Sequence, residues 1–147
     1  MITVRLARAA EISTCGEFYA RVLNASFTWL KASRPALAED FIAAAREEEV
    51  YLARDGEALV GVAGFFRPDS FIHNLFVDPP GRGIGKLMLD HLAGVADGPL
   101  SLKCQIPNLK ARAFYRREGF RVIGRGIDPG AEVGWVRLSR RSSNRPL

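Results

Sequence analysis

The sequence predicts one domain of the mixed α/β class, with about six or seven strands and about four helices. Three observations support this class. The 147 residues are enough for one compact core and too few for two domains. Alternating apolar patterns, typical of strands, and helical apolar spacing follow one another along the chain. Asp55-Gly56, between two apolar runs, is a strong signal for a β-hairpin, so part of the sheet is expected to be antiparallel.

The N-terminal third of the chain predicts one strand and two helices. Residues 2–7 alternate between apolar and polar side chains, and residues 11–23 carry apolar side chains at helical spacing. Residues 36–49 are rich in Ala and Glu and predict a second helix, with Leu37, Phe41 and Ala45 as its buried line. The acidic run at 47–49 is then expected to be the solvated end of this helix.

The middle of the chain predicts a hairpin, a central strand and a third helix. Residues 50–54 and 58–66 are the hairpin strands, and residues 71–77 are bulky enough for a buried strand. Pro79 and Pro80 end that strand because proline cannot donate to a ladder. Helical spacing begins at Gly83 and continues to about residue 97, with His91 expected to face solvent.

The last third predicts a strand, a helix and a final strand pair. Residues 100–106 are the strand, and Asn108 after Pro107 is a natural N-cap for a helix that runs to about residue 118. Residues 121–125 and 133–138 read as two strands around a Gly/Pro/Asp loop. We predict a domain over residues 1–139 and a basic, flexible tail over residues 140–147.

Composition excludes several classes of protein. Hydrophobic residues make up 48% and charged residues 25% of the chain, as in ordinary globular proteins, and no apolar run approaches the ~20 residues of a membrane span. The N-terminus lacks a signal peptide, so a cytoplasmic location is expected. Cys15 and Cys104 cannot define a disulfide framework or a metal site. The net charge is +5, but three arginines lie in the last eight residues, so nucleic acid is not the expected partner.

The junction between the central strand and the third helix has the chemistry of a phosphate site. Gly81, Gly83 and Gly85 alternate there, where the first turn of the helix has amides without internal partners and a partial positive charge. The order of the glycines is not the G-x-G-x-x-G dinucleotide fingerprint. Nor is it a P-loop, because Lys86 lacks the four-residue spacer and the following Ser/Thr. A plain structural turn is the alternative for this loop taken alone.

Two motifs in this sequence resemble those of the GCN5-related N-acetyltransferase (GNAT) family. The first is a strand ending in Val-Asp-Pro followed by Gln/Arg-x-x-Gly-x-Gly/Ala, which here reads Val77-Asp78-Pro79 and then Pro80-Gly81-Arg82-Gly83-Ile84-Gly85. Pro80 departs from the family's Gln/Arg, and Arg82 could supply the lost polar contact instead. The second motif, Asn-x-x-Ala-x-x-Phe-Tyr-x-x-x-Gly-Phe, is intact from Asn108 to Phe120.

The resemblance covers the chain to about residue 139 and implies a fold, a donor and a site. The fold is a mostly antiparallel central sheet with a splayed pair of central strands. The donor is acetyl-CoA, with no metal, and a homodimer is allowed. The residues implied in binding the donor are Leu75, Phe76, Val77, Arg82, Gly83, Ile84, Gly85, Lys86, Asn108 and Tyr115. Asn108 can serve both as a helix cap and as a cofactor contact.

The resemblance also suggests the groups that move protons. Tyr115 is the candidate general acid for the leaving thiolate, with a core aromatic as the alternative reading. An acceptor amine is mostly protonated at pH 7, so a base is needed. His73 in the central strand is one candidate, because an imidazole titrates near neutral pH, and a water held by Asn74 is another. A hydrogen-bonded structural histidine is the competing interpretation.

The predicted function is an N-acetyltransferase that moves the acetyl group of acetyl-CoA to a primary amine of a small molecule or a peptide. Phe27 and Trp29 belong to the segment that lines the acceptor side in the resembling family, so they are candidate substrate contacts, although an aromatic patch is more often core. One alternative is a coenzyme A-binding module without turnover, which Pro80 would favour. Another is an acyltransferase acting on an RNA-linked amine.

Overall fold

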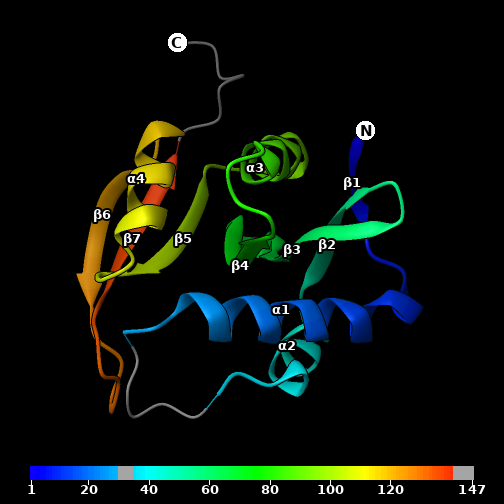
Figure 1. Cartoon of the computed structure of the whole chain (residues 1–147). Coiled ribbons are helices and arrows are strands. Elements are labelled where there is room, and N and C mark those ends of the chain that lie inside the picture. The colour runs from blue at the N-terminus through cyan, green and yellow to red at the C-terminus, as the bar shows by residue number, and fades with distance from the viewer. Residues whose placement is uncertain (30–34, 141–147) are drawn as a thin grey trace.

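The computed structural model describes residues 1–29 and 35–140. These residues form a mixed α/β domain around one seven-stranded sheet with the order β1-β2-β3-β4-β5-β7-β6, which confirms the predicted fold class (Figure 1). The strands are β1 (Ile2–Leu6), β2 (Glu49–Asp55), β3 (Ala58–Phe66), β4 (Phe71–Val77), β5 (Leu100–Gln105), β6 (Arg121–Gly126) and β7 (Trp135–Arg140).

The centre of the sheet is splayed, as the family resemblance implied. All neighbouring strands are antiparallel except β4 and β5, which are parallel. Their pairing is limited to Phe71 with Ser101 and Ile72 with Leu102, so β4 has no partner strand on its β5 side from residue 73 onward. In Figure 1, β5, β7 and β6 lie as a group to the left of β4. We call the opening between the two strands the fork.

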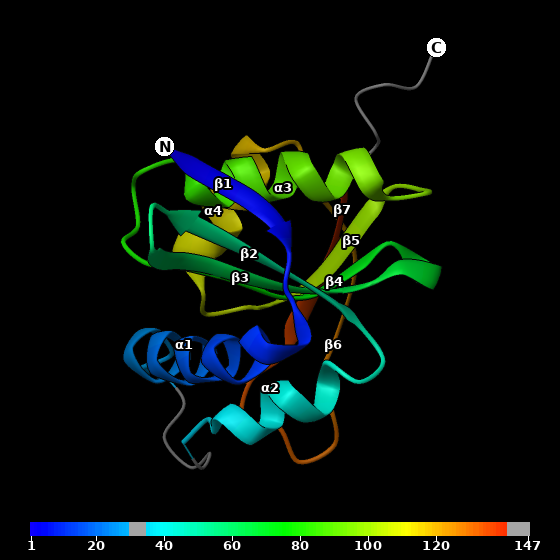
Figure 2. The ribbon, with the colours of Figure 1, turned by 90° about the vertical axis from the view of Figure 1, so that its right-hand side faces the viewer.

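Two helices cover each face of the sheet. Helices α1 (Ile12–Ser26) and α2 (Ala38–Ala44) lie on one face, and α3 (Ile84–Val95) and α4 (Leu109–Arg117) lie on the other (Figure 2). Each face has its own apolar core. The α1/α2 core includes Phe18, Phe41 and Val62, and the larger α3/α4 core includes Met88 and Leu138. The fork therefore lies between two packed layers.

The predicted second helix, over residues 36–49, is too long. Helix α2 ends at Ala44, and three weaker turn bonds carry the chain from Ala43 to Glu48, where it enters β2. The acidic run at 47–49 is not a solvated helix end. Only Glu47 is exposed, whereas the Glu49 carboxylate accepts hydrogen bonds of 2.6 and 2.8 Å from Arg67. Helical propensity is local, and here the contacts of Glu48 with His73 and of Glu49 with Arg67, both distant in the sequence, outweigh it.

Other differences from the prediction are small. The last strand is shifted by two residues, from 133–138 to Trp135–Arg140, so Arg140 belongs to β7 and donates to the carbonyl of Glu118. Residues 141–147, the rest of the predicted tail, lie outside the described residues. His91 is only partly exposed, and its ring lies edge-on against Tyr51 with centroids 5.3 Å apart. That contact joins α3 to β2.

Candidate functional site

The predicted phosphate cradle has the backbone geometry that an anion site needs. Gly83, with φ of 75°, is the N-cap of α3, and no side chain caps the helix. The first helical hydrogen bond runs from the amide of Leu87 to the carbonyl of Gly83. The amides of Ile84, Gly85 and Lys86 therefore have no partner in the described part of the chain. A Cβ built on Gly81 or Gly83 would meet nothing within 4 Å, so a diphosphate can approach here.

The two basic side chains of the cradle already have carboxylate partners. Arg82 donates to Asp55 at 2.9 Å, at the β2–β3 hairpin, and Lys86 lies 3.2 Å from Glu118 and 3.6 Å from Asp90. The Glu118 contact is the first cause of a raised pKa of Lys86. Arg82, the proposed substitute for the family's Gln/Arg, thus points to the hairpin in this state. The free amides, rather than these cations, are the groups open to an incoming phosphate.

The second motif places α4 against the cradle. Asn108 accepts a hydrogen bond of 3.2 Å from the amide of Ala111, which confirms it as the N-cap of α4. Phe114 lies beside the start of α3, where a Cβ on Gly85 would be only 3.0 Å from its ring. Glycine at residue 85 is therefore needed for the close approach of the two helices, independent of any ligand.

Tyr115 follows on the face of α4 that is turned to the sheet. Its side chain is buried between the rings of Phe114 and Phe120, with centroids 5.2 and 5.4 Å away. Burial raises the pKa of the phenol, and the Cys104 thiol of β5 adds to the rise. The hydroxyl makes no hydrogen bond with any residue in the described ranges. Tyr115 is thus both a core aromatic and a protonated donor without a partner.

On the opposite side of the sheet, aromatic rings line the approach to the fork. Phe27 stacks on Trp29 at 4.8 Å between ring centroids and lies 6.0 Å from Phe76 of β4. The indole Nε1 of Trp29 donates to Gln105 Oε1, at the end of β5, at 2.6 Å. Both Phe27 and Trp29 are half-buried. They connect the end of α1 to both strands of the fork.

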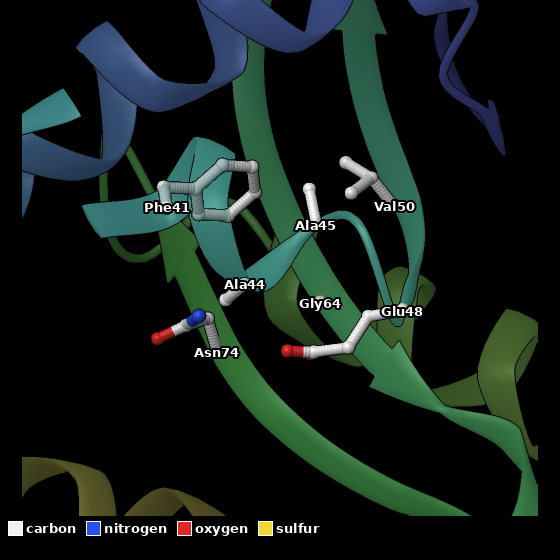
Figure 3. A pocket seen from close by; sticks show the side chains of 7 residues that line it. All are labelled: Phe41, Ala44, Ala45, Glu48, Val50, Gly64 and Asn74. Carbon is white, nitrogen blue, oxygen red and sulfur yellow. The ribbon is translucent and has the colours of Figure 1, made fainter. Parts of the chain in front are cut away.

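His73 and Asn74 lie at a β-bulge beside this face. Gly64 of β3 pairs with Asn74 and Phe65 pairs with Ile72, so His73 has no partner residue on β3. Its Nδ1 is 2.7 Å from Oε1 of Glu48, and this hydrogen bond raises the pKa of the imidazole. Figure 3 shows Glu48 and Asn74 with Phe41 of α2 around an adjoining small hollow.

Sequence reasoning missed Glu48 and Gln105. Glu48 stood in an acidic run that resembled a helix end, and Gln105 carried no motif at the end of its strand. Their partners, His73 and Trp29, are 25 and 76 residues away in the sequence. No local spacing could connect such pairs. Only the assumption that a strand histidine needs a buried carboxylate partner would have directed attention to Glu48.

Residues 1–29 and 35–140 contain neither a metal-binding cluster nor a membrane-spanning helix. No group of three or more His, Cys, Asp or Glu side chains among them could hold a metal ion. No helix in these ranges has the length and apolar character to cross a membrane.

Comparisons with known proteins agree with the resemblance seen in the motifs. The model of the acetyltransferase (GNAT) family matches residues 16–120. The peptidyl-lysine N-acetyltransferase YjaB of Salmonella typhimurium is 30% identical over 132 residues, which are 85% of this chain and 87% of that protein.

Solved structures match over nearly the whole chain. The solution structure of apo-form YjaB from Escherichia coli has a TM-score of 0.77 at 24% identity and covers 95% of this chain and 97% of that one. The structure of yncA from Salmonella typhimurium, described with its cofactor acetyl-CoA, has a TM-score of 0.71 at 18% identity and covers 99% and 96%. At these identities the structural likeness supports the fold.

The family match spans both the cradle and the second motif, and the free amides at Ile84 to Lys86 fit the diphosphate of the expected donor. This chain therefore belongs to the acetyltransferase (GNAT) family and is an N-acetyltransferase that uses acetyl-CoA as its acyl donor.

Proposed function

We propose that the acceptor is the primary amine of a lysine side chain in a peptide, or a small molecule with a similar alkylamine. The observation that carries this proposal is the fork, which is open along β4 beyond Ile72 and bordered by Phe27 and Trp29. A long aliphatic stem packs well against aromatic rings while its amine reaches the strand backbone. The 30% identical relative named as a peptidyl-lysine N-acetyltransferase supports the same acceptor class.

In this proposal the donor lies along the free edge of β4. The diphosphate binds the amides of Ile84, Gly85 and Lys86, with Arg82 and Asn108 as further contacts. The pantetheine arm lies beside Leu75, Phe76 and Val77, whose backbone has no β5 partner. A backbone amide near Phe76 donates to the oxygen that becomes negative when the thioester carbonyl is attacked. Such a fixed donor stabilises the charge without reorganising.

The proton balance assigns roles to two side chains. The acceptor ammonium first loses one proton to His73, directly or through a water held by Asn74, which frees its lone pair. The amine nitrogen then bonds to the carbonyl carbon, the C–S bond breaks, and Tyr115 gives its proton to the leaving sulfur. The second amine proton returns to Tyr115. One proton leaves overall, from His73 to solvent, and the imidazole can release it because His73 is 52% exposed.

Proton transfer from Tyr115 to the leaving sulfur depends on the relative pKa values of the phenol and the thiol. A phenol with a pKa of about 10 facing a thiol of about 8.5 makes proton transfer to a free thiolate unfavourable by roughly 2 kcal/mol. Transfer is favourable only while the C–S bond is breaking, or where burial also makes the sulfur more basic. The buried position of Tyr115 supports the second case, because we expect a sulfur bound beside it to be shielded from water as well.

The acceptor class is tested by turnover. Purified protein is incubated with acetyl-CoA and either lysine-containing peptides, N-terminal amines without lysine, or small alkylamines, and coenzyme A release is measured with a thiol reagent. Mass spectrometry then locates the added acetyl group. We expect release that depends on the lysine side chain. Binding of acetyl-CoA without release for any amine would favour the coenzyme A-binding module instead. A cytoplasmic location and a homodimer remain predictions.

A further inference from the structure

The pair formed by Glu48 and His73 is the feature of this site that the family motifs do not contain. Glu48 lies in the turn before β2, and His73 is the unpaired residue of the β4 bulge. The carboxylate is nearly buried, with 8% of its side chain exposed, whereas the imidazole is 52% exposed. The contact distances to Nδ1 are 2.7 Å from Oε1 and 3.3 Å from Oε2. A buried carboxylate thus holds one edge of a ring whose other edge is open.

The surrounding residues make room for this carboxylate. Gly64 of β3 stands opposite Asn74 of β4, and a Cβ built on Gly64 would lie 3.1 Å from Oε2 of Glu48. A side chain at residue 64 would therefore crowd the carboxylate. Figure 3 shows Glu48 reaching across Gly64 toward Asn74 at the edge of the hollow. The bulge, the glycine and the turn after α2 together position the pair.

The geometry also selects the tautomer of His73. A carboxylate only accepts hydrogen bonds, so the Nδ1 beside it must carry the proton. In the neutral ring, Nε2 then has a free lone pair. We propose that Glu48 is a positioning residue that holds His73 with Nε2 free to take the proton of the acceptor ammonium. This inference rests on the proposed function and identifies which of the candidate bases the chain uses.

The electrostatics of the pair agree with this role. The hydrogen bond to Glu48 is the first cause of the raised pKa of His73, and burial opposes it. Among the described residues, no other ionisable side chain makes a hydrogen bond or ion pair with the ring. Glu49 is bound to Arg67, and Lys103 of the neighbouring β5 has its Nζ over the Trp135 ring at 4.2 Å. A base with a raised pKa accepts a proton from an ammonium more readily.

A first experiment observes the ring directly and needs no turnover. The chain has only two histidines, so long-range ¹H–¹⁵N spectra of the imidazoles contain two spin systems, and His73→Gln assigns them. In the wild-type protein we expect neutral His73 as the Nδ1–H tautomer. Glu48→Gln keeps an oxygen acceptor but removes the charge, so the pKa of His73 falls. Glu47→Gln, at the exposed neighbouring position, leaves it unchanged.

A second experiment measures kcat/KM against pH for the same variants. Because the base must be neutral, the rate rises with pH through the pKa of His73. We expect Glu48→Gln to move this rise to lower pH and to lower the plateau, whereas His73→Gln lowers the plateau by roughly 10²-fold or more. A purely structural Glu48 would change the plateau without moving the rise.

The outcomes separate the two proposals. An Nε2–H tautomer in the wild-type protein overturns the inference even if Glu48→Gln does not fold, because that measurement uses no variant. If the enzyme turns over and Glu48→Gln has the same pH profile as the wild type, the inference is refuted but the proposed function stands. Absence of turnover with every amine refutes the proposed function, and the role of the pair with it.

Discussion

Replacing Tyr115 by Phe tests the proposed general acid with little disturbance of the fold. The substitution removes one oxygen from a side chain that is 8% exposed and keeps the ring contacts with Phe114 and Phe120. The hydroxyl makes no hydrogen bond within residues 1–29 and 35–140. The free energy of unfolding is therefore expected to change by less than about 1 kcal/mol. Any larger effect on turnover then reports on chemistry.

The expected effect on turnover is large. A lost general acid lowers kcat by roughly 10²–10⁴-fold, which is about 3–5 kcal/mol of transition-state stabilisation. The pH profile gives a second constraint. Burial raises the pKa of Tyr115 above its usual value of about 10, so the phenol stays protonated throughout the assay range. No alkaline decline of the rate below pH 10 is expected from this residue.

The assay combines coenzyme A release at saturating acceptor with calorimetric titration of acetyl-CoA. Tyr51→Phe is the matched control, because Tyr51 is also buried but donates to Glu49 at 2.7 Å. We expect the opposite result for it: turnover is kept, and stability falls by about 1 kcal/mol. Wild-type kcat in Tyr115→Phe would remove the phenol from the mechanism. A weaker affinity for acetyl-CoA that accounts for the whole loss would make Tyr115 a binding residue instead.

Three further predictions follow from the site and the fold. Gly83→Glu should abolish acetyl-CoA binding in calorimetry, because a carboxylate would occupy the anion position and the φ of 75° disfavours a side chain. The control Gly94→Glu, on the exposed side of α3, should bind acetyl-CoA normally. Trp29→Phe keeps an aromatic ring but loses the 2.6 Å hydrogen bond to Gln105. The KM for the acceptor should therefore rise by up to about tenfold, while the affinity for acetyl-CoA stays unchanged. An unchanged KM would show that this hydrogen bond plays no part in acceptor binding. Glu11 is bound by Arg5 and Arg54, and the Arg5 contact is the first cause of its strongly lowered pKa. Its stabilisation is therefore present at neutral pH and lost on acidification. The Tm difference between wild type and Glu11→Gln should shrink below about pH 4, the ordinary range of a glutamate, and a constant difference would argue against the ion pair.

Much of the fold could be predicted because its signals are local. The hairpin turn at Asp55-Gly56, the strand over residues 71–77 and the cap at Asn108 each depend on neighbouring residues, and all three are confirmed. Turn chemistry, alternation and capping act over a few residues, so a sequence pattern records them directly. The splayed strands came from the family resemblance rather than from any pattern in β4 or β5 themselves.

The site was less predictable because its side chains depend on distant partners. Arg82 was a candidate phosphate contact, but its orientation depends on Asp55, which lies 27 residues earlier. The role of Glu48 depends on a bulge that shifts the register between Gly64 and Phe65. A bulge can be read from a sequence only where apolar and polar residues alternate, and residues 71–77 are mostly apolar without alternation. Long-range pairs of this kind need the three-dimensional arrangement.

The short pairing of β4 with β5 also has a consequence for how the protein opens. Only two residue pairs join the two parts of the sheet, so the α3/α4 core and a few side-chain contacts, such as Lys86 with Glu118, must hold the parts together. We expect the β5–β7–β6 part to behave as a separate cooperative unit in native-state hydrogen exchange. A donor bound along β4 would touch both units and couple them. Acetyl-CoA would then protect amides in β5 and β7 that it never contacts.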